Sequence, residues 1–314
     1  MGIKWKRYLG DILSADGKLR INIQDRVAKG IGIMNTIHYF RIFNLLRESM
    51  FVNGTLTNAD IWYGLQEKDL QELEAIDREM IRKVFKCPFS TPVEAGHLEL
   101  GLLPLHCIIK ERRVNYLHYL IRSGKSEMLY KFFVAQWENP SKQDWTEQDW
   151  TEQVRVDLSE LGIREDIPFI ESKSQYCFKR LVKTKIKEFT LDLLNDRKFK
   201  HTKMDNLVFT ELIIQDYLVS EKLSVEQKRI IFLFRTRMAD YSENYRGQGP
   251  QKPCQICKFH VDSQTHSVNC AATMKNIRTK GNYNEIFSSN ISMETAMMLQ
   301  QIVEYRDNNL GENK

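Results

Sequence analysis

Long hydrophobic runs are absent from this 314-residue chain. The longest apolar stretches are about five residues, such as residues 230–234, whereas a membrane-spanning helix needs about 20. The opening residues, MGIKWK, carry lysines where a secretory signal would need an apolar core. A composition of 42% hydrophobic and 28% charged residues is ordinary for a globular protein. We therefore expect a globular protein without a membrane partner.

Cysteine is also scarce, with six in the whole chain. Cys87, Cys107 and Cys177 are widely spaced and stand in apolar contexts. This is typical of buried, reduced thiols and not of the disulfide framework of a secreted protein. The expected location is therefore a reducing intracellular compartment, nuclear or cytoplasmic.

Enzyme signatures are missing too. The chain has no GxSxG, P-loop or HExxH pattern and no adjacent Asp-Asp pair. Glu67, Glu72, Glu74 and Glu79 recur as the polar side of a helix, which indicates a solvated face and not an acid–base pair. His106 and Cys107 are neighbours that a helix would point apart, so we interpret both as packing residues.

The strongest positive signal is a cysteine–histidine cluster. Cys254 and Cys257 form a CxxC pair, and His266 and Cys270 follow as HxxxC. A tight turn would hold the first pair, while a helix capped by Asp262 or Ser263 would place the second pair on one face. Three thiolates and one imidazole suit a closed, structural Zn²⁺ site. His260 is a competing ligand, but it follows Cys257 so closely that His266 is preferred.

Charge is the second signal. The net charge is +5, yet residues 173–203 alone hold ten Lys/Arg against three Asp/Glu. A helix from Ser174 would turn its apolar positions inward and repeat Lys179, Lys183 and Lys187 along an outer stripe, with Arg180 and Lys185 beside it. Such a stripe suits a phosphate backbone. The alternative is that these lysines only keep the helix soluble.

The periodicity elsewhere predicts a mainly α fold. It comprises a short N-terminal β-hairpin turning at Ser14-Ala15-Asp16-Gly17, a multi-helix body and the small zinc-stapled element. Further helices are expected at about residues 20–42, 105–123, 154–161, 203–221, 225–241 and 292–306, and one within residues 61–86 whose apolar face runs from Leu70 to Val84. The pentapeptide QDWTE occurs twice without a gap at residues 143–152, and we expect this duplication in a loop with exposed tryptophans.

The order of these motifs resembles the C-terminal part of the reverse transcriptase of non-LTR (LINE/jockey-type) retrotransposons. The resemblance rests on Tyr8-Leu9-Gly10 with Ser14 to Lys18, on Arg26-Val27-Ala28, on Thr91-Pro92 with Glu99-Leu100-Gly101 and Pro104, on the run Arg112 to Leu120, and on the CCHC cluster. It covers about residues 5–270. It implies an end-of-palm hairpin (1–18), a thumb-like helical region (19–140), a helical connection with the basic helix (141–246), a CCHC zinc knuckle (247–282) and a C-terminal helix and tail (283–314).

The resemblance implies a nucleic-acid-binding fragment of an RNA-directed DNA polymerase that holds template, primer or target DNA. The family's aromatic-x-Asp-Asp signature has no counterpart here, so we expect a truncated chain without polymerase activity, since two-metal phosphoryl transfer needs clustered carboxylates. The residues expected to contact RNA or DNA are Lys179, Arg180, Lys183, Lys187, Arg235, Arg237, Lys258, Phe259 and Lys275. The alternative is a non-catalytic interaction protein or a decayed transposon copy, with self-association through an exposed thumb face.

Overall fold

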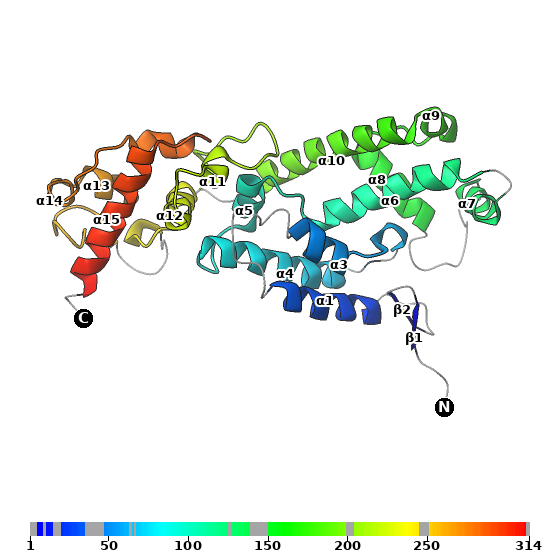
Figure 1. The fold of residues 1–314 in the computed structure, drawn as a ribbon, viewed down its shortest axis with the longest axis horizontal. Coiled ribbons are helices and arrows are strands. Elements are labelled where there is room, and N and C mark those ends of the chain that lie inside the picture. Colours follow the sequence, from blue (N-terminus) through cyan, green and yellow to red (C-terminus); the bar gives the residue numbers. More distant parts are fainter. Residues whose placement is uncertain are drawn as a thin grey trace. The chain divides into compact units, whose positions relative to one another are not determined.

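The computed structural model describes residues 5–8, 11–14, 20–34, 47–62, 65, 67–124, 127–138, 150–198, 204–244 and 251–311 (Figure 1). This part of the chain is mainly α-helical, as predicted. The α-helices are α1 (Arg20–Met34), α3 (Asn53–Thr55), α4 (Glu67–Phe85), α5 (Val93–Leu100), α6 (Leu105–Arg122), α7 (Met128–Glu138), α8 (Trp150–Glu160), α9 (Ile167–Glu171), α10 (Gln175–Lys198), α11 (Asp216–Val219), α12 (Val225–Arg235), α13 (Gln264–Asn269), α14 (Ala271–Met274) and α15 (Met293–Gly311). The structure also contains a short π-helix, η1 (Arg47–Val52), and three short 3-10 helices: η2 (Ala59–Ile61), η4 (Ser242–Asn244) and η5 (Tyr283–Phe287).

Two short strands precede α1. β1 (Trp5–Tyr8) pairs antiparallel with β2 (Asp11–Ser14), and the register runs from Trp5 opposite Ser14 to Tyr8 opposite Asp11. The connection is therefore residues 9 and 10, which lie outside the described residues. The turn predicted at Ser14 to Gly17 is in the wrong place, because Ser14 is itself the last residue of the second strand.

The chain divides into two compact units. The first comprises Met1–Ile37, Phe43–Met80 and Leu103–Leu193, and the second comprises His38–Ile42, Ile81–Leu102 and Leu194–Lys314. The boundaries at residues 80/81 and 193/194 fall inside the long helices α4 and α10, and the boundary at residues 102/103 falls between α5 and α6. None of the helices in the described ranges is long and apolar enough to cross a bilayer.

A hydrophobic core joins α6 to α10 in the first unit. Fully buried side chains come from each of these helices: Val114 and Leu117 of α6, Phe133 of α7, Leu158 of α8, Ile170 of α9, and Phe178, Val182 and Ile186 of α10. The three α10 residues are spaced by four, so one helix face enters the core while the opposite face remains outside. This confirms the inward face predicted for the basic helix.

Buried ion pairs accompany this core. The guanidinium of Arg47 makes a two-pronged contact with Asp77, at 2.7 and 2.6 Å, and also donates to the carbonyl of Leu103 at 2.9 Å. Asp157 of α8 accepts from Arg113 at 2.7 Å and from Lys110 at 3.0 Å, both on α6. Removing one partner would leave a buried charge without its counter-ion, so these pairs fix how the helices meet.

The duplicated QDWTE pentapeptide does not lie wholly in a loop. Its first copy falls outside the described residues, but Trp150 of the second copy begins α8. The indole of Trp150 is half-buried and donates from Nε1 to the carbonyl of Asp60 at 2.9 Å. The prediction of an exposed tryptophan is therefore wrong for this second copy.

The second unit centres on α12 and α15. Ser224 and Gln227 form a reciprocal cap that starts α12, and the rings of Phe232 and Phe85 stack with centroids 3.6 Å apart. α12 ends at Arg235 and not near residue 241 as predicted, because Arg237 adopts a positive φ of 50° that an α-helix cannot accommodate.

The helix predicted at residues 203–221 is also wrong. Only Asp216–Val219 is α-helical among the described residues of that range. Leu207 and Phe209 are buried whereas Val208 between them is 80% exposed, which is the two-residue period of an extended chain. Gln215 continues this extended course by donating from its backbone to the carbonyl of Glu99 at 2.9 Å.

His106 provides a pH-dependent element of stability in the first unit. Burial alone would lower its pKa, but contacts with Cys107 and with Glu74, whose carboxylate lies 2.5 Å from Nδ1, raise the pKa to about 9. The charged imidazole is therefore favoured in the folded state. Its contribution is fully present below the unfolded pKa of about 6.5 and is lost as pH rises toward 9.

We predict that the free energy of unfolding falls between about pH 6.5 and 9, by at most roughly 3 kcal/mol from this site. Urea denaturation across this range measures the change. Glu74→Gln should flatten the profile, because it removes the negative charge that stabilises the charged ring. An equally steep decline in the Glu74→Gln variant would contradict this assignment.

Candidate metal centre and basic surfaces

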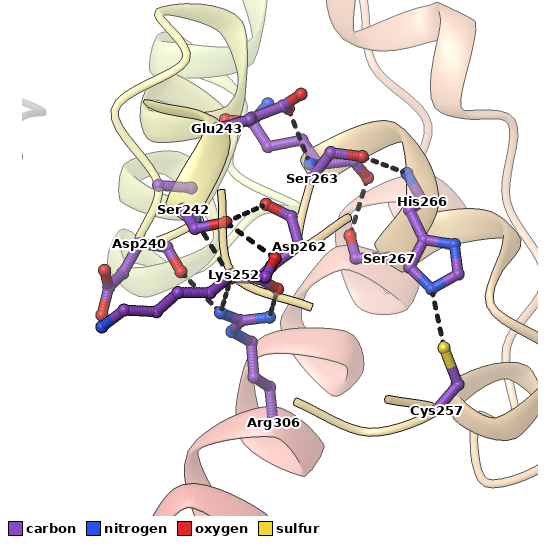
Figure 2. A network of polar contacts seen from close by, with 12 residues as sticks. Asp240, Ser242, Glu243, Lys252, Cys257, Asp262, Ser263, His266, Ser267 and Arg306 are labelled. Carbon is purple, nitrogen blue, oxygen red and sulfur yellow. Dashed lines mark hydrogen bonds and ion pairs between the residues drawn. The ribbon is translucent and has the colours of Figure 1, made fainter. Parts of the chain in front are cut away.

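The four predicted metal ligands lie together in the second unit. The four ligand atoms lie within 4.8 Å of one another. They are Sγ of Cys254, Cys257 and Cys270 and a ring nitrogen of His266. Sγ of Cys257 is 3.3 Å from Nε2 of His266 (Figure 2). His260 is not one of the four, although its ring lies 4.8 Å from that of His266 between centroids.

A tight turn brings the first two thiols into position. The amide of Cys254 donates to the carbonyl of His260 at 2.6 Å, and the amide of Lys258 donates back to the carbonyl of Cys254 at 2.9 Å. Lys258 adopts a φ of 65°, which lets the backbone reverse directly after Cys257. Pro253 and Val261 pair as an isolated antiparallel bridge that closes the loop.

The second pair of ligands comes from a capped helix. Ser263 caps α13 by accepting from the amide of His266 at 2.9 Å, so of the two predicted caps Ser263 is the one used. Cys270 lies between the two short helices, as the C-cap of α13 and the N-cap of α14, and its backbone is extended. The end of α13 thus brings Cys270 beside His266, although Cys270 is not itself helical as predicted.

The environment of Cys257 favours its thiolate, which is the form that binds metal. The backbone amides of His260 and Phe259 point to the Cys257 sulfur and lower the pKa of Cys257 to about 6. Cys257 is therefore largely a thiolate at neutral pH, and a thiolate is the form that binds metal. Burial raises the pKa of Cys254, so this thiol would lose its proton to a bound cation instead.

These residues fit a tetrahedral ion. Zinc–sulfur bonds of about 2.3 Å in a tetrahedron place sulfurs about 3.8 Å apart, so the cluster needs only to contract by about 1 Å. Three sulfurs and one imidazole nitrogen are a donor set that Zn²⁺ accepts and that Mg²⁺ or Ca²⁺ does not prefer. The cluster could hold a metal ion such as zinc, with all four positions filled by protein.

A buried ion pair anchors the metal-binding segment to α15. Both terminal nitrogens of Arg306 contact the carboxylate of Asp262, one of them at 2.7 Å, and the same carboxylate accepts from the amide of Ser242 at 3.0 Å (Figure 2). Arg306 also donates to the carbonyl of Asp240 at 3.0 Å and lies 4.4 Å above the Tyr241 ring. The sequence offered no signal for this contact, because Asp262 and Arg306 are 44 positions apart.

The residues predicted to bind nucleic acid fall into three groups. On α10, Lys179, Arg180 and Lys183 are exposed and Lys187 is half-buried. Around the metal cluster, Lys258 and Lys275 are exposed, and Phe259 is 89% exposed at the tip of the turn. Arg237 is half-buried at the end of α12.

Arg235 is the exception, because it is a structural residue. Its side chain is 2% exposed, and Nε donates to the buried carboxylate of Glu99 at 2.6 Å. Nη1 of Arg235 donates to the carbonyls of Ile286 and Ser288. The prediction that Arg235 contacts a phosphate is therefore wrong for this structure, since its guanidinium is already buried and paired.

Comparisons with protein-family models, with curated proteins and with solved structures find no match for this chain. The site is therefore interpreted from its own geometry.

We predict that the purified protein carries one zinc ion per chain, measured by mass spectrometry of the metal. Cys257→Ser should weaken zinc binding by roughly a hundredfold or more, since even groups outside the coordination sphere contribute about 10–100-fold in metal sites. Cys177→Ser is the matched control, because Cys177 is an exposed thiol on α10 outside the cluster. Equal zinc content in the two variants would contradict the assignment.

The Asp262–Arg306 pair generates a second prediction. Arg306→Met should destabilise the second unit by roughly 3–5 kcal/mol, because it strands the Asp262 carboxylate in a buried position. Replacing both partners, as Asp262→Asn with Arg306→Met, should recover part of this loss. A loss below about 1 kcal/mol in chemical denaturation would instead indicate a solvent-exposed pair.

Proposed function

We propose that this chain is a nucleic-acid-binding protein in which a zinc-stapled element and a basic helix contact RNA or DNA. We further propose that it corresponds to the C-terminal part of a non-LTR retrotransposon reverse transcriptase, where it would hold template, primer or target DNA. The observation that carries the first proposal is the unpaired row of cations on α10. The motif order described in the sequence supports the second.

The cations of this row share one face of α10. Lys179, Lys183 and Lys187 are four residues apart, so their Cα atoms follow each other at about 6 Å along the helix. No salt bridge is recorded for these three in the described chain, whereas the neighbouring Lys185 pairs with Glu188 at 2.9 Å. Three unpaired positive charges along one helix face are suited to successive phosphates of a nucleic-acid backbone.

One half-buried carboxylate, that of Glu111 on α6, acts on the row. Burial raises the pKa of Glu111, and the charges of Lys183 and Lys187 act against that rise. A phosphate bound at the row would therefore share these two lysines with Glu111, whereas Lys179 does not act on this carboxyl group.

The turn between the first two metal ligands offers a different kind of contact. Phe259 is 89% exposed between Lys258 and His260, where it stabilises nothing in the described fold. An exposed aromatic ring flanked by a cation suits stacking on an unpaired base with a nearby phosphate contact. Lys275, which follows α14, would add a second backbone contact. The metal would be structural, since a closed four-ligand site leaves no position for substrate.

A protein-interaction role is the second candidate. Met128, Leu129 and Phe132 of α7 are 72%, 47% and 60% exposed and lie on adjoining turns of one helix. Clustered exposed apolar side chains are typical of surfaces that a partner or a second copy covers. This patch lies within the segment expected to form the thumb-like region, so self-association would use the surface anticipated from the sequence.

The salt dependence of binding to a structured RNA tests the leading proposal. Replacing Lys179, Lys183 and Lys187 together by Gln should weaken binding at low salt and reduce the slope of log K against log salt by about 0.7–0.9 per lost contact. The matched control replaces Lys68, Lys83 and Lys131 by Gln, which removes the same charge from exposed positions of α4 and α7.

Equal losses in the two triple variants would show that net charge alone attracts RNA. Absence of binding even at low salt would overturn the nucleic-acid proposal and favour the interaction surface on α7. Concentration-dependent oligomers that Phe132→Ser abolishes would support that second candidate.

A further inference from the structure

A cavity of about 640 Å³ opens beside the metal-binding segment in the second unit. This volume lies within the range of about 300–1,000 Å³ that small-ligand sites occupy. One wall is α13, the helix that carries His266, and the facing walls come from the end of α12, residues 280–284 and α15. Nothing in the proposed role of α10 uses this cavity, so it needs its own explanation.

Two cations face this cavity. Arg237 and Lys280 both line it, and no salt bridge is recorded for either within the described chain. The acidic residue in the lining is Glu243, and its carboxylate already accepts from the amide of Gln264 at 2.9 Å at the start of α13. The two positive charges thus exceed the one negative charge, and an anionic group is favoured.

Arg237 occupies a backbone position that normally selects glycine. The amide of Met238 donates to the carbonyl of Leu233 at 2.8 Å, and that of Arg237 donates to the carbonyl of Phe234 at 3.2 Å. These two bonds end α12 in a Schellman motif with Arg237 at the left-handed position, where φ is 50°. Because glycine is relaxed at this position, Arg237 can be replaced by glycine without disturbing the end of α12.

Aromatic rings form another part of the lining. Tyr283 and Phe287 both border the cavity, and their rings meet edge to face with centroids 6.0 Å apart. Phe234 makes a second edge-to-face contact with Tyr283 at 6.4 Å, which fixes the orientation of the tyrosine ring. Fixed aromatic rings beside cations are the combination that receives a base together with a phosphate.

Amide side chains complete the chemistry. Asn206 and Asn284 line the cavity with exposed side chains, and no side-chain hydrogen bond is recorded for either in the described chain. Amide groups can both donate to and accept from the edge of a nucleobase. Gln264 is different, because its amide is already bonded to the carbonyl of Phe234 at 2.9 Å and to Asn244 at 3.1 Å.

The wall that carries Lys280 is held in place by α15. A Cβ at Gly281 would approach the backbone of Thr295 to 2.4 Å, so only glycine permits this close contact. The amide of Asn282 donates to the hydroxyl of Thr295 at 2.9 Å, and the amide of Thr279 donates to Gln301 at 3.2 Å. The backbone around Lys280 is therefore already ordered, so ligand binding does not have to offset the entropy of ordering it.

We propose that this cavity binds a nucleotide, with its base against the Tyr283–Phe287 pair and its phosphate between Arg237 and Lys280. The ligand chemistry is a nucleobase joined to an anionic phosphate. It can come from a free mononucleotide or from an unpaired nucleotide of an RNA or DNA strand. This site is separate from the α10 row, so either can fail without the other.

The test measures calorimetric binding of AMP and UMP to the full chain, beside adenosine and inorganic phosphate as half-ligands. AMP or UMP should bind saturably, and each half-ligand should bind at least about tenfold more weakly, because it loses either the stacking or the charge-assisted contact. Absence of saturable nucleotide binding at millimolar concentration would overturn the proposal. Equal affinity for phosphate and AMP would reduce the cavity to an anion site and also overturn it.

Arg237→Gly separates folding from binding. Glycine relaxes the left-handed position, so the melting temperature should stay equal or rise, while nucleotide affinity should fall about tenfold or more. Arg278→Gln is the matched control, because it removes the same charge from an exposed position outside the cavity lining. Similar affinity in the Arg237→Gly variant and the wild type would contradict the assignment.

Two further arms identify the source of the nucleotide. If a ten-nucleotide oligothymidylate competes with UMP, the cavity binds a nucleotide of a nucleic-acid strand. If UMP binds and the oligonucleotide does not compete, the ligand is a free nucleotide. The triple Gln variant of the α10 row should retain full AMP and UMP affinity. Loss of both in that variant would contradict the independence of the two sites.

Discussion

Residues 251–274 are organised around four side chains and not around a hydrophobic core. Val268 is the one large apolar side chain that is buried in this segment, beside the thiols of Cys254 and Cys270. So small an apolar contribution cannot offset the conformational entropy of ordering the chain. A metal ion bound by the four side chains would supply the missing stabilisation. The Asp262–Arg306 contact ties the segment to α15, because removing either partner would leave a buried charge without its counter-ion. The wall of the adjoining cavity depends on the same segment, because α13 serves both.

Basic side chains play two roles that differ by environment. Arg47, Arg113, Arg235 and Arg306 are buried, and each is paired with a carboxylate. The planar guanidinium suits such sites because it can make several directed hydrogen bonds to a carboxylate or to carbonyl groups at once. Lys179, Lys183 and Lys187 of α10 are exposed or half-buried, and they make no ion pair within the described part of the chain. Only cations without a carboxylate partner are available to bind an external anion, so the net charge of the chain is a poor guide to binding. The α10 row and the cavity still hold such unpaired cations.

The sequence predicted features that repeat locally and missed features that depend on distant contacts. The inner face of α10 followed from Phe178, Val182 and Ile186 at helical spacing, and the grouping of the ligands followed from CxxC and HxxxC. Spacing could not reveal that Arg235 meets Glu99 across 136 positions. It also could not reveal that Arg237 takes a left-handed backbone, which shortened α12. The helix expected at residues 203–221 failed because its apolar residues pack against the rest of the unit as extended chain.

X-ray absorption at the zinc edge of the purified protein tests the central claim most directly, because it reports the ligands themselves. The account predicts three sulfurs at about 2.3 Å and one imidazole nitrogen at about 2.0–2.1 Å, with no bound water. A spectrum with an oxygen ligand, or with fewer than three sulfurs, would contradict it. The site would then be open or assembled from other residues, and the segment would need another source of stability.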